Sequence, residues 1–340
     1  MQNLIGQTPA EVSVYQGYSN QLFSGQYPYK DFWFEYPPGL LGLASIPRLM
    51  SANPDHFFLI WLGMILVGII LSWLIVGKKS IWFIAACLSG GLLLTHRFDF
   101  FPALLVLISI QLFNKKMSFF PAFLITVAGF MKLYPFLMIP LLFVYRPVNK
   151  WLNVLLGFLL AFIPFMFVWF PGAARFLEFH GNKPVQIESI QGMFYADSTP
   201  IIYERFSWVF DETASNNKIL LVALTITYLL LFVLRKRSSL AISSFIVVLL
   251  FILLGGIFSP QYMLWLASFL PFISPLIAVQ VIGATWLSSF YFQFYDGLVS
   301  HQFIGKLPEY LLIKTRNIWL LAIFAIKSAK LLLNRLNKDL

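Results

Sequence analysis

Carboxylates, tyrosines and prolines are concentrated near the beginning of the chain. Glu11 lies four residues before Tyr15, and the segment PYKDFWFEYPP at 28–38 contains Asp31 and Glu35. A carboxylate can act as a general base that takes the proton of a hydroxyl group, and aromatic faces beside it can stack on a sugar ring. Glu11, Asp31 and Glu35 are therefore candidate catalytic residues, with a solvated juxtamembrane loop as the simpler alternative.

Two cations stand inside or beside apolar runs. Arg97 lies in the sequence THRFD, and Lys132 lies in GFMKLYP, three residues before a proline that would hinge a helix. A charge beside hydrocarbon is costly, so a functional role is expected for both, and Lys132 at such a hinge could bind a lipid phosphate. The alternatives are an Arg97–Asp99 pair that caps a helix and a Lys132 side chain that snorkels to the headgroups.

Two later polar segments complete the set of candidates. The longest polar stretch contains FHGNKPVQIES, in which His180 and Lys183 bring an imidazole and a cation close to a carboxylate. Gln261 and Tyr262 follow in SPQY, at the start of an apolar run. Neither spacing is diagnostic by itself, and ordinary loop structure is the alternative for both.

Several other chemistries find no support in the sequence. There is neither a Walker A motif nor a GxGxxG loop, so nucleotide-driven work within this chain is not expected. Cysteine and histidine residues do not show zinc-binding spacing, and the four histidines are scattered. We expect no cofactor, while a divalent cation held by the outer carboxylates is left open without support. The single cysteine, Cys87, fits a small buried apolar residue.

The elements that must position these residues are membrane helices. Hydrophobic residues make up 59% of the chain and charged residues only 11%, against about 25% charged residues in soluble domains. Backbone amides in lipid must form hydrogen bonds internally, so long apolar runs there become helices. We therefore predict an all-α, polytopic membrane protein. The expected spans are 56–76, 80–94, 98–113, 119–131, 133–145, 151–170, 219–234, 239–255, 262–273, 275–294 and 311–333.

Basic clusters predict the orientation of these spans. The clusters hold 13 of the 24 lysines and arginines, the same side of the membrane carries one acid, Asp339, and the clusters alternate correctly with every span. Cytoplasmic loops favour Lys and Arg, so this side is predicted to be cytoplasmic and the acid-bearing side extracytoplasmic. The clusters are at 78–79, 115–116, 146–150, 235–237 and 327–338. A net charge of +10 is thereby explained without a nucleic-acid partner.

We predict a single transmembrane domain over residues 1–340. It comprises an outer loop with juxtamembrane helices (1–55), transmembrane helices (56–170), an outer loop (171–216), and transmembrane helices with a short cytoplasmic tail (217–340). Residues 37–50 are expected to form a helix that lies in the outer interface or dips partly into the membrane. The polar N-terminal tail would lie outside with no span before it. Either the protein is truly N-out, or a first transmembrane helix is absent from this chain.

The motifs, taken in order, resemble a known family. They are Glu-x3-Tyr, PYKDFxxEYPP, RFD, KLYP, KPVQIES and SPQYxxW, and they extend from about residue 11 to 270. This order resembles the bacterial polyprenyl-phosphate-dependent glycosyltransferases of the GT-C fold, most closely glycosyltransferase family 87, which includes mannosyltransferases of cell-envelope glycolipids. The resemblance implies a GT-C-like bundle in the cell membrane with juxtamembrane helices in its outer loops. In the family the first outer loop follows a first transmembrane helix, so we expect that such a helix is absent from this chain and that the protein is not truly N-out.

The resemblance also implies an activity. Such enzymes transfer a hexose from a polyprenyl-phosphate donor to a glycolipid or glycan acceptor on the extracytoplasmic face, with inversion at the anomeric carbon. A carboxylate of the first outer loop is the base, and Glu11 ranks before Asp31 and Glu35 for this role, although the family usually has Asp where this chain has Glu11. Basic residues near the membrane contact the donor phosphate, and the matching positions are Arg97, Lys132 and Lys183. His180, Gln261 and Tyr262 would lie near the sugar or the acceptor.

Two other functions stay open. A transporter or flippase for lipid-linked sugars would also need polar residues in the membrane and a phosphate-binding lysine. Transporters often contain repeated halves and helices that break at the middle of the membrane. The sequence shows no internal repeat, and its polar residues gather on one face, which favours the enzyme. A non-catalytic, degenerate relative is the third hypothesis.

Overall fold

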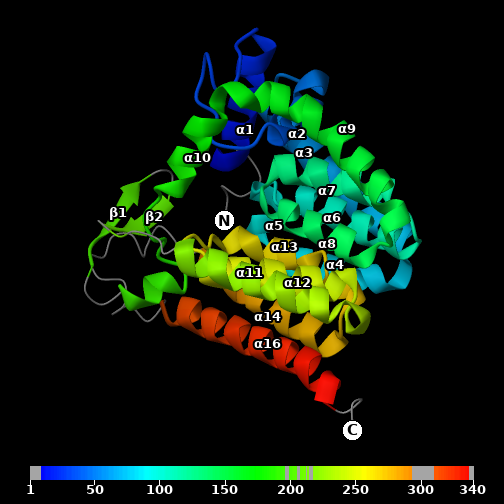
Figure 1. Ribbon diagram of the computed structural model, residues 1–340. Helices are drawn as coiled ribbons and strands as arrows, with labels where there is room; N and C mark the ends of the chain where they lie inside the picture. The colour runs from blue at the N-terminus through cyan, green and yellow to red at the C-terminus, as the bar shows by residue number, and fades with distance from the viewer. Residues whose placement is uncertain are drawn as a thin grey trace. The chain divides into compact units, whose positions relative to one another are not determined.

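Helices dominate the structure, a computed structural model that describes residues 9–195, 199–204, 207–211, 213, 217–292 and 310–336 (Figure 1). The residues that the structure describes are mostly helical and contain two short strands, which confirms the all-α class. The chain divides into two compact units. Unit 1 consists of Met1–Ile81 and Leu92–Leu177, and unit 2 of Trp82–Gly91 and Glu178–Leu340.

Unit 1 is a helical assembly with short 3₁₀ turns between its helices. Its helices are α1 (Ala10–Phe23), α2 (Gly39–Met50), α3 (Pro54–Val76), α5 (Leu92–His96), α6 (Phe100–Asn114), α7 (Phe119–Met131), α8 (Ile139–Tyr145) and α9 (Trp151–Trp169), and α10 (Ala173–Gly181) begins in it. The longest, α3, starts where the Asn53 side chain accepts hydrogen bonds from two backbone amides of the first turn. It ends at Gly77, which adopts a φ of 74° that favours glycine.

Small residues let the helices of unit 1 approach one another closely. A Cβ atom placed on Gly39 of α2 would lie 2.7 Å from the backbone carbonyl of Phe130 in α7. On Gly68 of α3 it would lie 2.6 Å from the ring of Phe100 in α6. The prediction that residues 37–50 form a helix is thus confirmed by α2, which packs on α7 through its first glycine.

Helices α7 and α8 form a hairpin that turns at Lys132. Lys132 ends α7 in an extended conformation, with φ −150° and ψ 131°, and a 3₁₀ turn at Tyr134–Met138 leads into α8. At the far end of α8, Arg146 Nη2 donates a hydrogen bond to the carbonyl of Met117, 2.6 Å away, just before α7 begins. The chain therefore returns to the level at which α7 started, and the predicted hinge at Lys132 is confirmed.

Unit 2 combines long apolar helices with a small β-hairpin. Its elements are α4 (Ile81–Ser89), β1 (Ile201–Glu204), β2 (Ser207–Phe210), α11 (Asn217–Val233), α12 (Leu240–Leu254), α13 (Met263–Ala267), α14 (Pro275–Phe292) and α16 (Tyr310–Leu336). The two strands are antiparallel, with Ile201 opposite Phe210. The sequence predicts a polar outer loop at 171–216. Helix α10 in this segment agrees with the helices expected in the outer loops, whereas the hairpin was not predicted.

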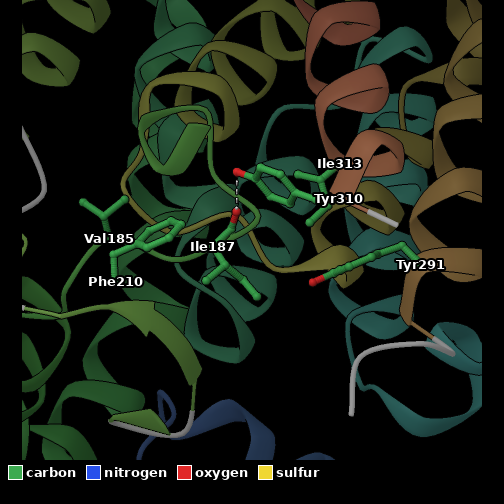
Figure 2. Packing of buried hydrophobic residues seen from close by; sticks show 6 residues of the cluster. All are labelled: Val185, Ile187, Phe210, Tyr291, Tyr310 and Ile313. Atoms are coloured by element: carbon green, nitrogen blue, oxygen red, sulfur yellow. Dashed lines mark hydrogen bonds between the residues drawn. The ribbon is translucent and has the colours of Figure 1, made fainter. Parts of the chain in front are cut away.

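A buried cluster fixes the segment before the hairpin to the long helices of unit 2. Val185 and Ile187 pack with Phe210 of β2, Tyr291 of α14 and Tyr310 of α16 (Figure 2). The Tyr310 hydroxyl donates a hydrogen bond to the carbonyl of Ile187 over 3.3 Å. The loop that carries Lys183 is therefore held by side chains from far along the sequence.

Among the residues that the structure describes, three helical segments are long and apolar enough to cross a membrane. They are Pro54–Ser89, Val148–Trp169 and Pro275–Phe292. Large apolar side chains project outward from them, for example Leu74, which is 72% exposed. Helices α6, α7, α11 and α12 are also apolar but contain only 13 to 17 residues. The sequence likewise predicts spans shorter than the usual length at these positions.

Candidate functional site

Two ion pairs lie at the ends of helices in unit 1. Arg97 Nη2 is 3.0 Å from Glu11 Oε1, and Lys132 Nζ is 3.4 Å from Asp99 Oδ1. We refer to these four residues as the ionic cluster. Three of them are partly exposed, with side-chain exposures of 28% for Glu11, 22% for Arg97 and 16% for Lys132, whereas Asp99 is fully buried. The Glu11–Arg97 pair is thus accessible to a solute, whereas Asp99 of the second pair lies inside the protein.

Four separate elements position the ionic cluster. Glu11 lies in the first turn of α1, Arg97 in the link between α5 and α6, Asp99 immediately before α6, and Lys132 immediately after α7. The carboxylate of Asp99 makes no capping hydrogen bond to α6. The capping role proposed as the alternative for Asp99 is therefore wrong, and Arg97 forms an ion pair with Glu11 from another helix.

Aromatic rings enclose the ionic cluster. Phe98 is the central ring, with Lys132 Nζ 4.7 Å from its centroid and the rings of Tyr15 and Tyr36 at 5.6 and 5.2 Å. The ring of Tyr15 also contacts Trp61 of α3, with centroids 5.5 Å apart. A cation over an aromatic face is attracted by the electron density of the ring. The aromatic wall formed by these rings therefore stabilises the charge of Lys132.

Burial and electrostatic interactions shift the pKa values of several groups in and around the ionic cluster. Burial raises the pKa of the Tyr15 phenol, which stays protonated at neutral pH. Burial acts to lower the pKa of Arg97, but Tyr15, Glu11, Tyr36 and Asp99 outweigh it and the pKa is raised. Arg97 therefore remains a cation. The pKa of His96 is lowered, mainly by burial.

The other two candidate bases have local partners. Asp31 is exposed, and its carboxylate accepts a hydrogen bond from the backbone amide of Tyr27 over 2.6 Å. Glu35 is partly buried and forms a hydrogen bond with the side chain of Tyr36, which belongs to the aromatic wall. Glu35 thus adjoins the cluster, whereas Asp31 stabilises a turn. Of the three carboxylates, Glu11 is the one in the ionic cluster.

The remaining candidates lie in unit 2. His180 lies in the last turn of α10, and its ring is nearly perpendicular to that of Phe179. Lys183 is buried, with 8% exposure. Gln261 is also buried, while Tyr262 stacks on Trp265 with ring centroids 3.7 Å apart. A hydrogen bond of 3.0 Å from Gln186 Nε2 to Ser259 Oγ joins the two motifs in which these residues occur. The segments FHGNKPVQIES and SPQY, which the sequence analysis considered together, are therefore in contact in the structure.

The sequence analysis overlooks Arg316. Its side chain is 1% exposed inside α16, and its guanidinium carbon lies 3.8 Å from the ring centroid of Phe258. The same guanidinium donates a hydrogen bond to the carbonyl of Glu188, and Asn317 donates another over 3.2 Å. The signal that would have found Arg316 is an ionisable residue within the predicted span 311–333.

Unit 2 also contains an open apolar cleft of about 350 Å³. It is lined by Ile190, Gln191, Phe194, Tyr195, Ile219, Leu253 and Leu254. None of the candidate residues lines this cleft. Within the described parts of the chain, His, Cys, Asp and Glu side chains form no group of three that could hold a metal ion.

Comparisons with protein-family models, with curated proteins and with solved structures found no match to this chain.

Proposed function

We propose that this protein is a membrane glycosyltransferase that transfers a hexose from a polyprenyl-phosphate donor to an acceptor hydroxyl. In this proposal the chain is a polytopic bundle of the GT-C type, and the ionic cluster faces the extracytoplasmic side. The support is the order of the sequence motifs together with the placement of Glu11, Arg97, Asp99 and Lys132 in one cluster of unit 1. The structural part of this support lies in unit 1, while the last two motifs lie in unit 2.

One observation carries it. The Glu11 carboxylate is 28% exposed and is fixed by an arginine 3.0 Å away that remains charged. A partly exposed carboxylate that an ion pair holds in place can reach an incoming hydroxyl, as a general base must. Charged residues that only solvate a loop would not need an aromatic wall and a second, buried pair behind them.

The chemistry assigned to the site is a single displacement. Glu11 accepts the proton of the acceptor hydroxyl while the acceptor oxygen forms a bond to the anomeric carbon of the donor. The bond from that carbon to the phosphate oxygen breaks, and polyprenyl phosphate leaves with the electron pair. The new glycosidic bond has inverted configuration. Arg97 and Lys132 provide positive charge for the negative charge that develops on the leaving phosphate, a form of stabilisation that is strongest in a water-excluded site.

Transfer of labelled hexose from polyprenyl-phosphate donors by the purified protein tests this function. We expect Glu11→Gln to lower kcat by about 10²–10⁴-fold, the usual contribution of a general base, and Asp31→Asn to have a much smaller effect. Asp55→Asn is the matched control, because Asp55 is an exposed carboxylate in the first turn of α3, just as Glu11 is in the first turn of α1. If folded protein transfers none of several sugars, the transferase proposal fails. If Glu11→Gln keeps full activity, the base is another residue.

A further inference from the structure

Tyr15 has a buried hydroxyl that the fold does not satisfy. The side chain is 1% exposed, and its hydroxyl oxygen has no hydrogen-bond partner among the residues that the structure describes. Native proteins pair nearly all buried polar atoms, since an unpaired one loses its hydration without compensation. Tyr29 in the same unit shows the usual arrangement, because its hydroxyl donates to the backbone carbonyl of Tyr36. The orphaned Tyr15 hydroxyl therefore calls for an explanation.

The position of Tyr15 connects it to the ionic cluster. It lies one helical turn after Glu11 in α1, and residues four apart share one face of a helix. Its ring is held between Trp61, Phe98 and Tyr36, with centroid distances of 5.5, 5.6 and 6.1 Å. Among the charged residues, Arg97 has the largest effect on the pKa of the phenol, followed by Asp99 and Glu11.

The chemistry of these groups selects the ligand. Burial raises the pKa of Tyr15, so at neutral pH the phenol is a neutral donor rather than an anion. Arg97 and Lys132 are donors that carry positive charge, and neither has an acceptor atom. Two cations and a neutral hydroxyl donor suit an oxyanion with several acceptor oxygens, and phosphate offers such oxygens in a compact tetrahedral group. A sugar hydroxyl would satisfy the phenol but would leave the cations without a new partner.

We propose that the Tyr15 hydroxyl is a phosphate-binding group, which donates a hydrogen bond to a phosphate oxygen that Arg97 and Lys132 hold electrostatically. This inference rests on the proposed function, in which the phosphate is that of the polyprenyl donor. It adds Tyr15 to the groups that would contact this phosphate, on the ground that its buried hydroxyl lacks a hydrogen-bond partner. The shared chemistry is a phosphate group, whether linked to a lipid or free.

Tyr15→Phe is the decisive variant, because it removes one oxygen atom and keeps the ring in its aromatic wall. Without added ligand, the purified variant should be at least as thermally stable as the wild type, since it loses an unpaired buried polar atom. With a polyprenyl monophosphate in detergent, its dissociation constant should rise roughly tenfold, as expected for loss of a hydrogen bond to a charged group. Inorganic phosphate is titrated in parallel. If it binds with the same dependence on Tyr15, the site recognises phosphate itself; if only the polyprenyl compound binds, the site recognises the lipid-linked form.

Tyr29→Phe is the matched control, because it removes a buried hydroxyl that has a partner. It should lower thermal stability and leave phosphate affinity unchanged. The inference is overturned if Tyr15→Phe is destabilised like Tyr29→Phe, fails to fold, or binds both phosphates as the wild type does. Measuring phosphate binding and sugar transfer together distinguishes a failure of this inference from a failure of the proposed function. Weaker phosphate binding by Tyr15→Phe in a protein that transfers no sugar supports the phosphate site and refutes the transferase, whereas normal transfer with unchanged binding refutes Tyr15 alone.

Discussion

Replacing Lys132 by methionine should destabilise the protein far more than replacing Glu11 by glutamine, although each change breaks one ion pair. Lys132→Met keeps the length of the side chain and removes its charge. It leaves Asp99, which is fully buried, without the ammonium group 3.4 Å away. Glu11→Gln instead leaves Arg97, which at 22% exposure can still reach water. The two pairs therefore differ in whether the charge that remains after the substitution can be hydrated.

The magnitudes follow from burial. Removing one partner of a buried pair costs about 3–5 kcal/mol because the other charge stays buried and uncompensated. Since the Lys132 side chain is itself 16% exposed, we expect the lower end, about 3 kcal/mol. A partly exposed pair is screened by water, so Glu11→Gln should cost less than about 1 kcal/mol. A Lys132→Met/Asp99→Asn double variant should recover part of the loss, because the buried charge is then gone.

Unfolding of the purified protein in detergent, followed by the fluorescence of its ten tryptophans, measures these differences. The double variant serves as the internal control, since it separates the buried charge from the loss of packing around Lys132. Equal stabilities for Lys132→Met and Glu11→Gln would refute the reasoning. So would a double variant that is less stable than Lys132→Met, because the cost would then come from packing and not from an unpaired charge.

Two further predictions concern packing and pH. Gly39→Ala should destabilise the protein by about 1–3 kcal/mol, because the new methyl group would lie 2.7 Å from the backbone of α7. Gly42→Ala, in the same helix with no atom within 4 Å, should leave the free energy of unfolding unchanged or raise it. The pKa of His96 is lowered from 6.5 in the folded protein. The unfolded chain thus binds the proton first, and stability should decrease as the pH falls below about 6.5. His96→Asn should reduce this slope.

Each of these predictions has a clear contrary result. If Gly39→Ala and Gly42→Ala unfold at the same denaturant concentration, α2 and α7 do not make the close contact that the glycine provides. If the wild type and His96→Asn lose stability in parallel between pH 7 and pH 5, the environment of His96 does not disfavour its charged form.

The sequence predicted local features well where the physical cause is local. The turn at Lys132 is an example, since a charged residue and Pro135 interrupt an apolar run whatever the rest of the fold does. The span predicted at 56–76 also agrees closely with α3 (Pro54–Val76), which is bounded by the local signals of Asn53 and Gly77. In both cases the residues that cause the feature are neighbours in the chain.

Pairings between distant segments could not be predicted. The only partner that the sequence suggested for Arg97 was Asp99, as the alternative to a functional role, whereas the pairing of Arg97 with Glu11 depends on how α1 packs. The orphaned hydroxyl of Tyr15 is likewise a property of the packed structure. The span expected at 80–94 breaks near Gly91, where a φ of 51° ends helix α4 and the Ser289 hydroxyl donates to the carbonyl of Gly90. That contact joins residues 199 positions apart.

The hairpin of α7 and α8 has a consequence for the membrane around it. With 13 residues, α7 is about 20 Å long at 1.5 Å per residue, whereas the hydrocarbon core of a bilayer is about 30 Å thick. In a bilayer, Lys132 would therefore lie roughly 10 Å short of the far interface. A phosphate headgroup that meets it has to descend, or the lipid next to the hairpin has to thin, at a cost that rises with every ångström of mismatch. Lipid acyl-chain length then becomes a determinant of how readily the ionic cluster is reached.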